Sequence, residues 1–171
     1  DTPEFEISEK EVKEKINFFV NNEGTHSVDY YHKKLGLIMW NKVGMARNKE
    51  GLTEAMAEIK ALREDFWQNV KVTGGNDQMN PELEKAGRVA DFLELGELFA
   101  KDALDREESC GGHFREESVE VDGEQKGEAK RKDEEYAYVS AWEYKGEPGD
   151  AILHKEELEF NDIELKQRSY K

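Results

Sequence analysis

The sequence predicts a mainly α-helical chain: an antiparallel, up-and-down bundle of three to four helices, followed by a small irregular and β-structured C-terminal extension. Apolar residues recur every three or four positions over most of residues 1–110. Short polar loops separate these runs, which favours antiparallel neighbours. After the adjacent Gly111 and Gly112 the pattern changes to the alternation of strands. We therefore expect a helical bundle domain over residues 1–110 and a small extension with short strands over residues 111–171.

The first helix is expected to begin at Ser8, because Ser8 and Glu11 have the spacing of a capping box. Ile7 and Val12 can form the hydrophobic staple around that box. A polar Asn-Asn-Glu-Gly sequence ends the run. The apolar residues expected on its buried face are Val12, Ile16, Phe19 and Val20.

The second helix is expected to follow Ser27, which serves as its N-cap. Gly36 and Gly44 lie inside its pattern and lower helix stability, so we expect close contact between helices at both positions. Trp40 and Val43 are expected to cover a flank of the core. The residues expected to face that core are Tyr30, Tyr31, Leu35, Ile38 and Met39.

Asn48 is the expected cap of a third helix, and Asn80 with Pro81 begins a fourth. The third helix has the clearest apolar stripe, and the adjacent Gly111 and Gly112 are expected to stop the fourth. The predicted core positions of both helices are Leu52, Ala55, Met56, Ile59, Leu62, Phe66, Val70, Ala86, Val89, Ala90, Leu93, Ala100 and Leu104.

The extension is expected to form short strands. Residues 119–132 contain Gly123 and Gly127 and are expected to form a hairpin or a flexible loop. Aromatic and small residues alternate over 136–144, the period of a strand, and two further strands are expected at 152–160 and 163–165. The extension offers little apolar surface to cover its own aromatic residues, so we expect that face to dock on something larger.

The formal net charge of −15 excludes nucleic acid as an expected partner, because phosphate backbones repel such a surface. Cys110 is the single cysteine among 171 residues, which is typical of a reducing compartment. No apolar run is long enough to span a bilayer. The chain begins Asp-Thr-Pro without an initiator methionine, so we expect a fragment of a longer protein.

The sequence holds little that could carry chemistry by itself. The histidines are scattered without metal-ligand spacing, and no glycine-rich phosphate loop follows a strand. Cys110 and His113 could form a nucleophile and base, but the C-terminus of a helix raises the pKa of a thiol. For His113 and Arg115 two interpretations remain open. They donate to the unpaired carbonyls at the helix end, or they face another domain or subunit.

The sequence around these residues resembles a known family. Residues 93–98 and 102–117, with Glu-Ser-Cys-Gly-Gly-His-Phe-Arg-Glu-Glu at the end, are similar to the C-terminal region of the flavoprotein subunit of succinate dehydrogenase and fumarate reductase, in a bacterial branch. Residues 62–67, 141–146 and 168–170 add to the likeness. The family motif is kept at Ser109, Gly111, His113 and Arg115, whereas Cys110 replaces an arginine, Gly112 an alanine and Glu117 an aspartate.

The resemblance implies that this chain is a structural piece of an oxidoreductase subunit. In the family, the FAD-binding domain, the flavin-carrying histidine and the substrate-binding residues lie N-terminal to this region, so no catalytic, cofactor-binding or metal-binding residue is assigned here. FAD is expected in the parent subunit and none in this chain. The implied partners are the FAD-binding and capping domains of the same chain, an iron–sulfur subunit and, indirectly, a membrane anchor. The parent complex is expected to be peripheral on the cytoplasmic face of the inner membrane.

Five residues are expected to lock this piece to its neighbours: Ser109, Gly111, His113, Arg115 and Arg168. Two other functions stay open on the residues alone. One is a free-standing helical module that binds proteins through its aromatic strand region, and the other is an enzyme that uses Cys110 and His113.

Overall fold

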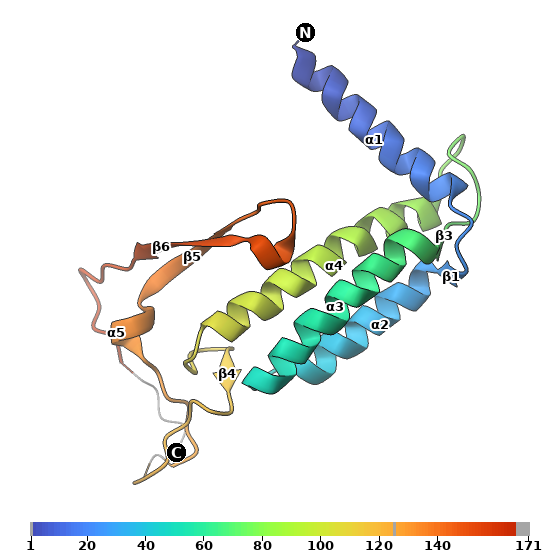
Figure 1. Cartoon of the computed structure of the whole chain (residues 1–171). Coiled ribbons are helices and arrows are strands. Elements are labelled where there is room, and N and C mark those ends of the chain that lie inside the picture. The colour runs from blue at the N-terminus through green and yellow to red at the C-terminus, as the bar shows by residue number, and fades with distance from the viewer. Residues whose placement is uncertain (1, 125, 167–171) are drawn as a thin grey trace.

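The computed structural model describes residues 2–124 and 126–166. Three long helices lie side by side in alternating directions (Figure 1): α2 (Val28–Lys42), α3 (Lys49–Asn69) and α4 (Pro81–Asp105). Another helix, α1 (Pro3–Asn21), projects from one end of this bundle. The predicted mainly helical fold is confirmed, with three packed helices and one that reaches beyond them.

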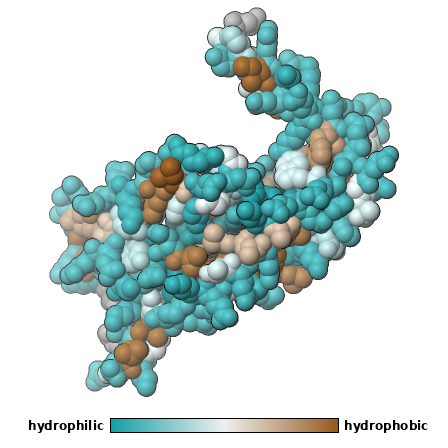
Figure 2. Space-filling model, in the orientation of Figure 1, coloured by the Kyte–Doolittle hydropathy of each residue, from teal (hydrophilic) through white to brown (hydrophobic). Residues whose placement is uncertain are grey.

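The core lies between α2, α3 and α4. The stripes predicted for the third and fourth helices supply most of it, and of those positions only Met56, Leu62 and Leu104 are partly rather than fully buried. Figure 2 shows that the surface is mostly hydrophilic, as the net charge requires, with apolar side chains exposed on the bundle and on α1. The fully buried large apolar side chains are Phe19, Val28, Tyr31, Leu52, Ile59, Phe66, Val70, Val89 and Leu93.

Three of the predicted N-caps are confirmed. The side chains of Ser27, Asn48 and Asn80 each accept a hydrogen bond from a backbone amide in the first turn of the helix that follows. The predicted start at Ser8 is wrong, because α1 begins at Pro3. A proline at the first helical position has no amide to leave unpaired, so the helix can begin there without a capping box.

The expectation for the glycines of the second helix is also wrong. A Cβ placed on Gly36 would meet no atom within 4 Å, and Gly44 lies beyond the end of α2. The close contact is at Gly96 of α4, where a Cβ would lie 3.3 Å from Leu35 Cδ1. Trp40 does not cover the core either, since it is 83% exposed.

Two short parallel strand pairs tie the ends of the bundle together. At one end β1 (His26–Ser27) pairs with β3 (Val70–Lys71), and at the other β2 (Ala46–Arg47) pairs with β4 (Phe114–Arg115). Sequence periodicity does not reveal two-residue strands, so both pairs were missed. They fix the connections between helices in register: His26 opposite Val70, and Ala46 opposite Phe114.

The extension forms a hairpin. Strand β5 (Tyr138–Glu143) pairs antiparallel with β6 (Ile152–Glu157), after a single helical turn α5 (Asp133–Tyr136) and with a 3₁₀ turn η1 (Pro148–Asp150) in the connection. The Glu120 amide donates to the Glu128 carbonyl and Val119 forms an antiparallel bridge with Ala129, so of the two alternatives for residues 119–132 the hairpin is the one that forms. The strand predicted at 163–165 is wrong, because among the described residues β6 already pairs with β5 and no further ladder forms.

The hairpin lies along α4 (Figure 1). Trp142 Nε1 donates to Asp102 Oδ1 over 2.7 Å, and Lys101 Nζ donates to the carbonyls of Gly149 and Ala151 at 2.6 and 2.9 Å. Tyr138 is buried, whereas Tyr144 stays 54% exposed. The aromatic face of the extension therefore docks on a helix of its own chain.

Candidate functional site

The most specific motif of the sequence lies in the segment from Arg106 to Glu117, called here the junction segment. It leaves α4, whose last residue is Asp105, and so the predicted helix stop at the glycines is wrong. The glycines instead form a tight turn in which Cys110 and His113 exchange backbone hydrogen bonds of 2.9 and 3.0 Å. Gly111 has a φ of 59°, a left-handed conformation that glycine adopts without a steric penalty.

Arg115 closes the C-terminal end of α4. Its Nη1 atom donates to the carbonyl oxygens of Ala103 and Leu104, both at 3.1 Å, and to that of Arg106 at 3.4 Å. These carbonyls belong to the last turn of a helix and its cap, where no amide follows to pair with them. Arg115 is only 3% exposed, so its charge is held among backbone oxygens that satisfy it. The interpretation that Arg115 ties the turn to the helix is confirmed.

Ser109 fastens the other side of the turn. Its Oγ atom accepts from the Arg115 amide at 2.8 Å and donates to the Arg115 carbonyl at 3.1 Å. Its own amide donates to the Lys130 carbonyl at 2.9 Å. Ser109 is fully buried, and its hydroxyl completes a pairing that backbone groups alone leave open.

His113 uses both ring nitrogens. Nε2 lies 2.8 Å from the Arg106 carbonyl, and Nδ1 lies 2.7 Å from Arg47 Nη1. A carbonyl only accepts and a guanidinium only donates, so the ring carries its proton on Nε2 and is neutral. Burial lowers the pKa of His113, and the neighbouring Arg47, Arg115 and Arg106 charges act in the same direction.

This geometry removes the chemical basis for a Cys110–His113 enzyme. The base would need a free ring nitrogen directed at the thiol, but both nitrogens of His113 are engaged elsewhere. Cys110 meets His113 through the backbone and not through the ring. The pair closes a turn.

The junction segment also holds the other two helices. It reaches α2 through Arg47, whose Nη1 atom lies 2.7 Å from His113 Nδ1. Arg47 Nε in turn donates to the Val43 and Gly44 carbonyls just after α2, at 3.1 and 2.9 Å. Glu117 accepts from the Lys49 amide at the start of α3 at 2.6 Å. Burial opposes ionisation of Glu117, but that amide and the Arg115 guanidinium outweigh it and lower its pKa. One segment therefore gathers the ends of three helices.

Sequence reasoning missed a buried ion pair between α3 and α4. Arg63 of α3 and Glu97 of α4 are 6% and 3% exposed and form an ion pair of 3.0 Å, and Arg63 also reaches Glu147 of the extension at 2.6 Å. Burial raises the pKa of Glu97. The sequence did contain a sign of this burial, because Glu97 lies between the core positions Leu93 and Ala100 on one face of the helix.

Residues 2–124 and 126–166 contain neither a candidate metal site nor a candidate membrane-spanning helix. No three His, Cys, Asp or Glu side chains of that part gather where they could hold a metal ion. None of its helices combines the length and apolarity needed to cross a bilayer. Arg168, the fifth predicted interface residue, lies outside the described residues.

Comparison with known proteins identifies the family. The sequence pattern of the family described as fumarate reductase flavoprotein C-term matches residues 32–170. The chain belongs to this family. The match includes the whole junction segment, so the sequence resemblance is confirmed.

Curated relatives place the family domain in larger proteins. The fumarate reductase flavoprotein subunit of Helicobacter pylori is 33% identical over 114 residues, which cover 67% of this chain and 16% of that protein. The L-aspartate oxidase of a Synechocystis strain is 26% identical over 101 residues, covering 52% of this chain and 18% of the relative. This chain spans 16 to 18% of the length of these relatives, so the family domain is a small part of each.

A solved structure shares the fold of this chain. A structure titled quinol-fumarate reductase with menaquinol molecules superposes with a TM-score of 0.77 at 21% identity, over 96% of this chain and 27% of that one. At this identity the likeness shows the fold. The match extends beyond residues 32–170 and therefore includes at least part of α1.

Proposed function

We propose that this chain is the C-terminal helical domain of a flavoprotein subunit that interconverts succinate and fumarate with FAD and passes electrons through an iron–sulfur subunit to quinone. The observation that carries the proposal is the family match over residues 32–170, together with a fumarate reductase flavoprotein subunit as a relative at 33% identity. The L-aspartate oxidase relative shares the domain, so the domain alone does not select the substrate.

The flavin is proposed to lie in the preceding part of the subunit. A dinucleotide site of the usual kind needs a parallel sheet whose strand leads through a glycine-rich turn into a helix. In the described residues the parallel pairs are two residues long, and the Gly74-Gly75 loop that leads from β3 to α4 lacks the Gly-x-Gly-x-x-Gly spacing of a dinucleotide site. These residues do not fit FAD. The role proposed for the chain is to brace the subunit.

Within that role, the junction segment is proposed to be the contact with the FAD-binding and capping domains. Gly111 and Gly112 are exposed at the tip of the turn, and His113 is half-buried beside them. Ser109 and Arg115 are buried and hold the turn in shape from within. Arg168 is proposed to belong to the same contact. The division at residues 110 and 111, between helical domain and extension, is part of this proposal.

The proposed location of the subunit also follows from its family. It would lie at the cytoplasmic face of the inner membrane, held there by its iron–sulfur partner and, indirectly, by a membrane anchor. The net charge of −15 supports protein partners over nucleic acid or a direct contact with anionic lipid.

The decisive experiment recovers the reading frame upstream of Asp1 and expresses both the full-length subunit and the 171-residue chain. The full-length subunit is expected to purify with one flavin and to oxidise succinate with an artificial electron acceptor. The short chain is expected to purify colourless. An upstream frame without a flavin-binding domain, or stoichiometric flavin on the short chain, would contradict the proposal.

The junction is tested in the same full-length protein. His113→Ala removes the link between Arg47 and the Arg106 carbonyl, so flavin content or assembly with the iron–sulfur subunit should fall. The matched control is His154→Ala, because His154 is an exposed histidine of the hairpin paired with Glu143. Equal flavin content and equal assembly in the two variants would refute the interface role of His113.

A further inference from the structure

Helix α1 contacts the bundle through its last turns. Phe18 and Phe19 pack against Trp67 with ring centroids 5.4 and 5.5 Å apart, and Phe19 also meets Phe66 at 6.0 Å. Residues 3–15, which precede these turns, are exposed. This part of α1 leans away from α4 (Figure 1). A helical segment of this length is marginal in water without tertiary packing, so its order calls for a partner.

The exposed part of α1 is apolar on one face. At 100° per residue, Phe5, Val12 and Ile16 fall on the same side as the buried Phe19. Phe5 is 75% and Val12 57% exposed. The stripe therefore continues the core face of the helix into solvent.

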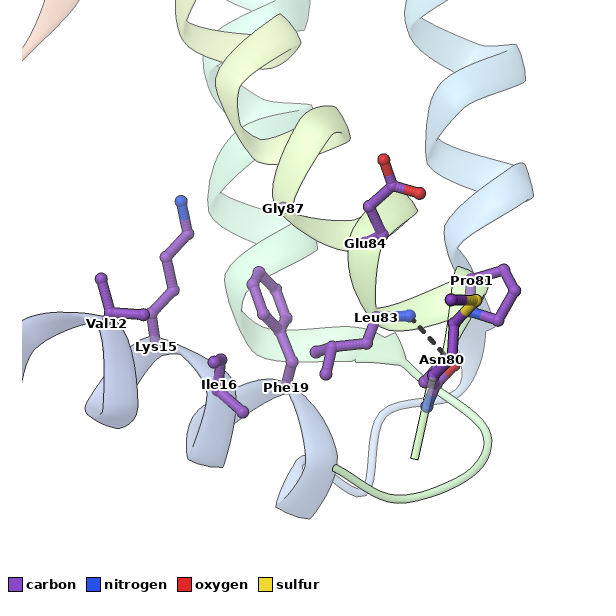
Figure 3. Close-up of a pocket in the computed structure, with 10 residues that line it drawn as sticks. Val12, Lys15, Ile16, Phe19, Asn80, Pro81, Leu83, Glu84 and Gly87 are labelled. Atoms are coloured by element: carbon purple, nitrogen blue, oxygen red, sulfur yellow. Dashed lines mark hydrogen bonds between the residues drawn. The ribbon is translucent and has the colours of Figure 1, made fainter. Parts of the chain in front are cut away.

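The stripe borders a cleft of about 590 Å³ between α1 and the start of α4. Figure 3 shows Val12, Ile16 and Phe19 on the α1 side and Leu83 opposite them, with a gap between the two helices. Met79, which precedes α4 and lines the same cleft, is 94% exposed. This cleft is lined mainly by apolar side chains, and α1 and α4 are linked across it by the ion pair between Lys15 and Asp91.

The polar groups at the rim are already paired. Lys15 lies 3.4 Å from Asp91, and Glu84 bonds to Arg88 at 2.7 Å. The Asn80 amide is used in capping α4 and in bonds to the Thr73 and Gly75 carbonyls. A small-molecule site usually directs a few unpaired polar groups at its ligand. This cleft offers none among those three side chains, so an apolar protein surface suits it better.

We infer that this cleft receives an apolar segment of the residues that precede Asp1 in the parent subunit. The inference rests on the proposed function, in which this chain is the C-terminal part of a longer subunit. The relatives it matches extend well beyond the shared domain, since the chain spans 16% of the Helicobacter pylori protein. A segment joined to α1 by the backbone is present at millimolar effective concentration, which favours it over a second copy of the chain.

The test measures hydrogen exchange of the α1 amides in the full-length subunit and in the 171-residue chain. In the full-length protein the amides of residues 8–14 should exchange about 100-fold more slowly, because packing suppresses local opening. Val12→Asp in the full-length protein should abolish that protection. The matched control is Ile7→Asp, since Ile7 is 55% exposed but lies about 140° away around the helix.

Both variants place the same residue type in the same helix, so a general loss of helicity would affect them alike. Equal exchange of residues 8–14 in the full-length and short proteins would overturn the inference. So would concentration-dependent dimers of the short chain that Val12→Asp disrupts and that protect α1 equally well, because a second copy would then occupy the cleft.

Flavin content separates this inference from the proposed function. A full-length subunit that carries flavin and oxidises succinate, but leaves α1 unprotected, would overturn the occupant of the cleft and keep the function. As an independent probe, the dye 1-anilinonaphthalene-8-sulfonate should bind the short chain in a manner sensitive to Val12→Asp and not bind that site in the full-length protein. Binding there by both proteins would show an open cleft and would also overturn the inference.

Discussion

Arg115 shows how one side chain can end a helix. Helix C-termini are commonly closed by a glycine in the left-handed conformation. Here α4 ends with Arg106 in an extended conformation, and the carbonyls near its end receive a buried guanidinium instead. This explains why the glycines are displaced to positions 111 and 112, where they turn the chain back so that Arg115 can reach the helix.

Replacing Arg115 with methionine should destabilise the chain by roughly 2–4 kcal/mol, because the carbonyls of the last turn lose a charged donor in a buried setting. The measurement is the midpoint of urea unfolding. Arg88→Met is the control, since Arg88 pairs with Glu84 on an exposed helix face and should cost less than about 1 kcal/mol. Equal losses would show that the buried bonds of Arg115 carry no special weight.

His113 should make stability depend on pH. Its pKa in the folded chain lies below the ordinary 6.5, so the unfolded chain binds more protons between those two values. Stability from this group is present above pH 6.5 and is lost as pH falls towards the folded pKa. The slope cannot exceed about 1.4 kcal/mol per pH unit for one proton.

His113→Gln keeps a donor and an acceptor but does not titrate. The difference in unfolding free energy between wild type and variant should therefore shrink as pH falls from 7 to 5. Glu97, whose pKa is raised, contributes with the opposite sign in this range, but it is present in both proteins and cancels. A difference that stays constant with pH would contradict a neutral, buried His113.

At the scale of elements, local chemistry set the helix starts and packing set the roles of the glycines. Ser27, Asn48 and Asn80 cap their helices as the sequence predicts, because a cap depends on residues only two or three positions away. Gly36 and Gly96 cannot be distinguished in this way. One faces open space and the other faces Leu35 across the bundle.

This difference predicts opposite outcomes of substitution. Gly36→Ala should stabilise the chain by about 0.5–1 kcal/mol, because the new methyl group meets no atom within 4 Å and alanine favours helix. Gly96→Val should destabilise it by about 1–3 kcal/mol, because even a Cβ there lies 3.3 Å from Leu35 Cδ1. Thermal unfolding midpoints of both variants test the pair. A stabilising Gly96→Val would show that the contact between α2 and α4 is loose.

At the scale of the whole molecule, the extension is attached to the bundle by charge as well as by apolar packing. Glu147 approaches from the hairpin connection and pairs with Arg63, whose other partner is Glu97 on α4. Three segments far apart in sequence meet at one guanidinium. The arrangement explains why a carboxylate is tolerated in the core stripe of α4.

A double-mutant cycle tests this triad. Arg63→Met alone should cost about 3–5 kcal/mol, because Glu97 is left buried without its partner. Arg63→Met combined with Glu97→Leu should recover most of that loss, since apolar residues of similar volume often replace a buried pair at little cost. Urea unfolding of the four proteins gives the coupling. Additive losses would show that the two side chains act independently.

Spacing along single segments was enough to predict the helical bundle, the short strands of the extension, most of the core stripes and the family motif. It misplaced the start of α1, the end of α4, the exposure of Trp40 and the roles of Gly36 and Gly44. The roles of Arg115, His113 and Arg63 became visible in the folded structure alone. The chain turns back so that Arg115 reaches carbonyls 9 to 12 positions earlier, whereas His113 and Arg63 have partners 34 to 84 positions away. A spacing pattern records which side of a helix is apolar, whereas the partner of a buried charge is set by which surfaces meet.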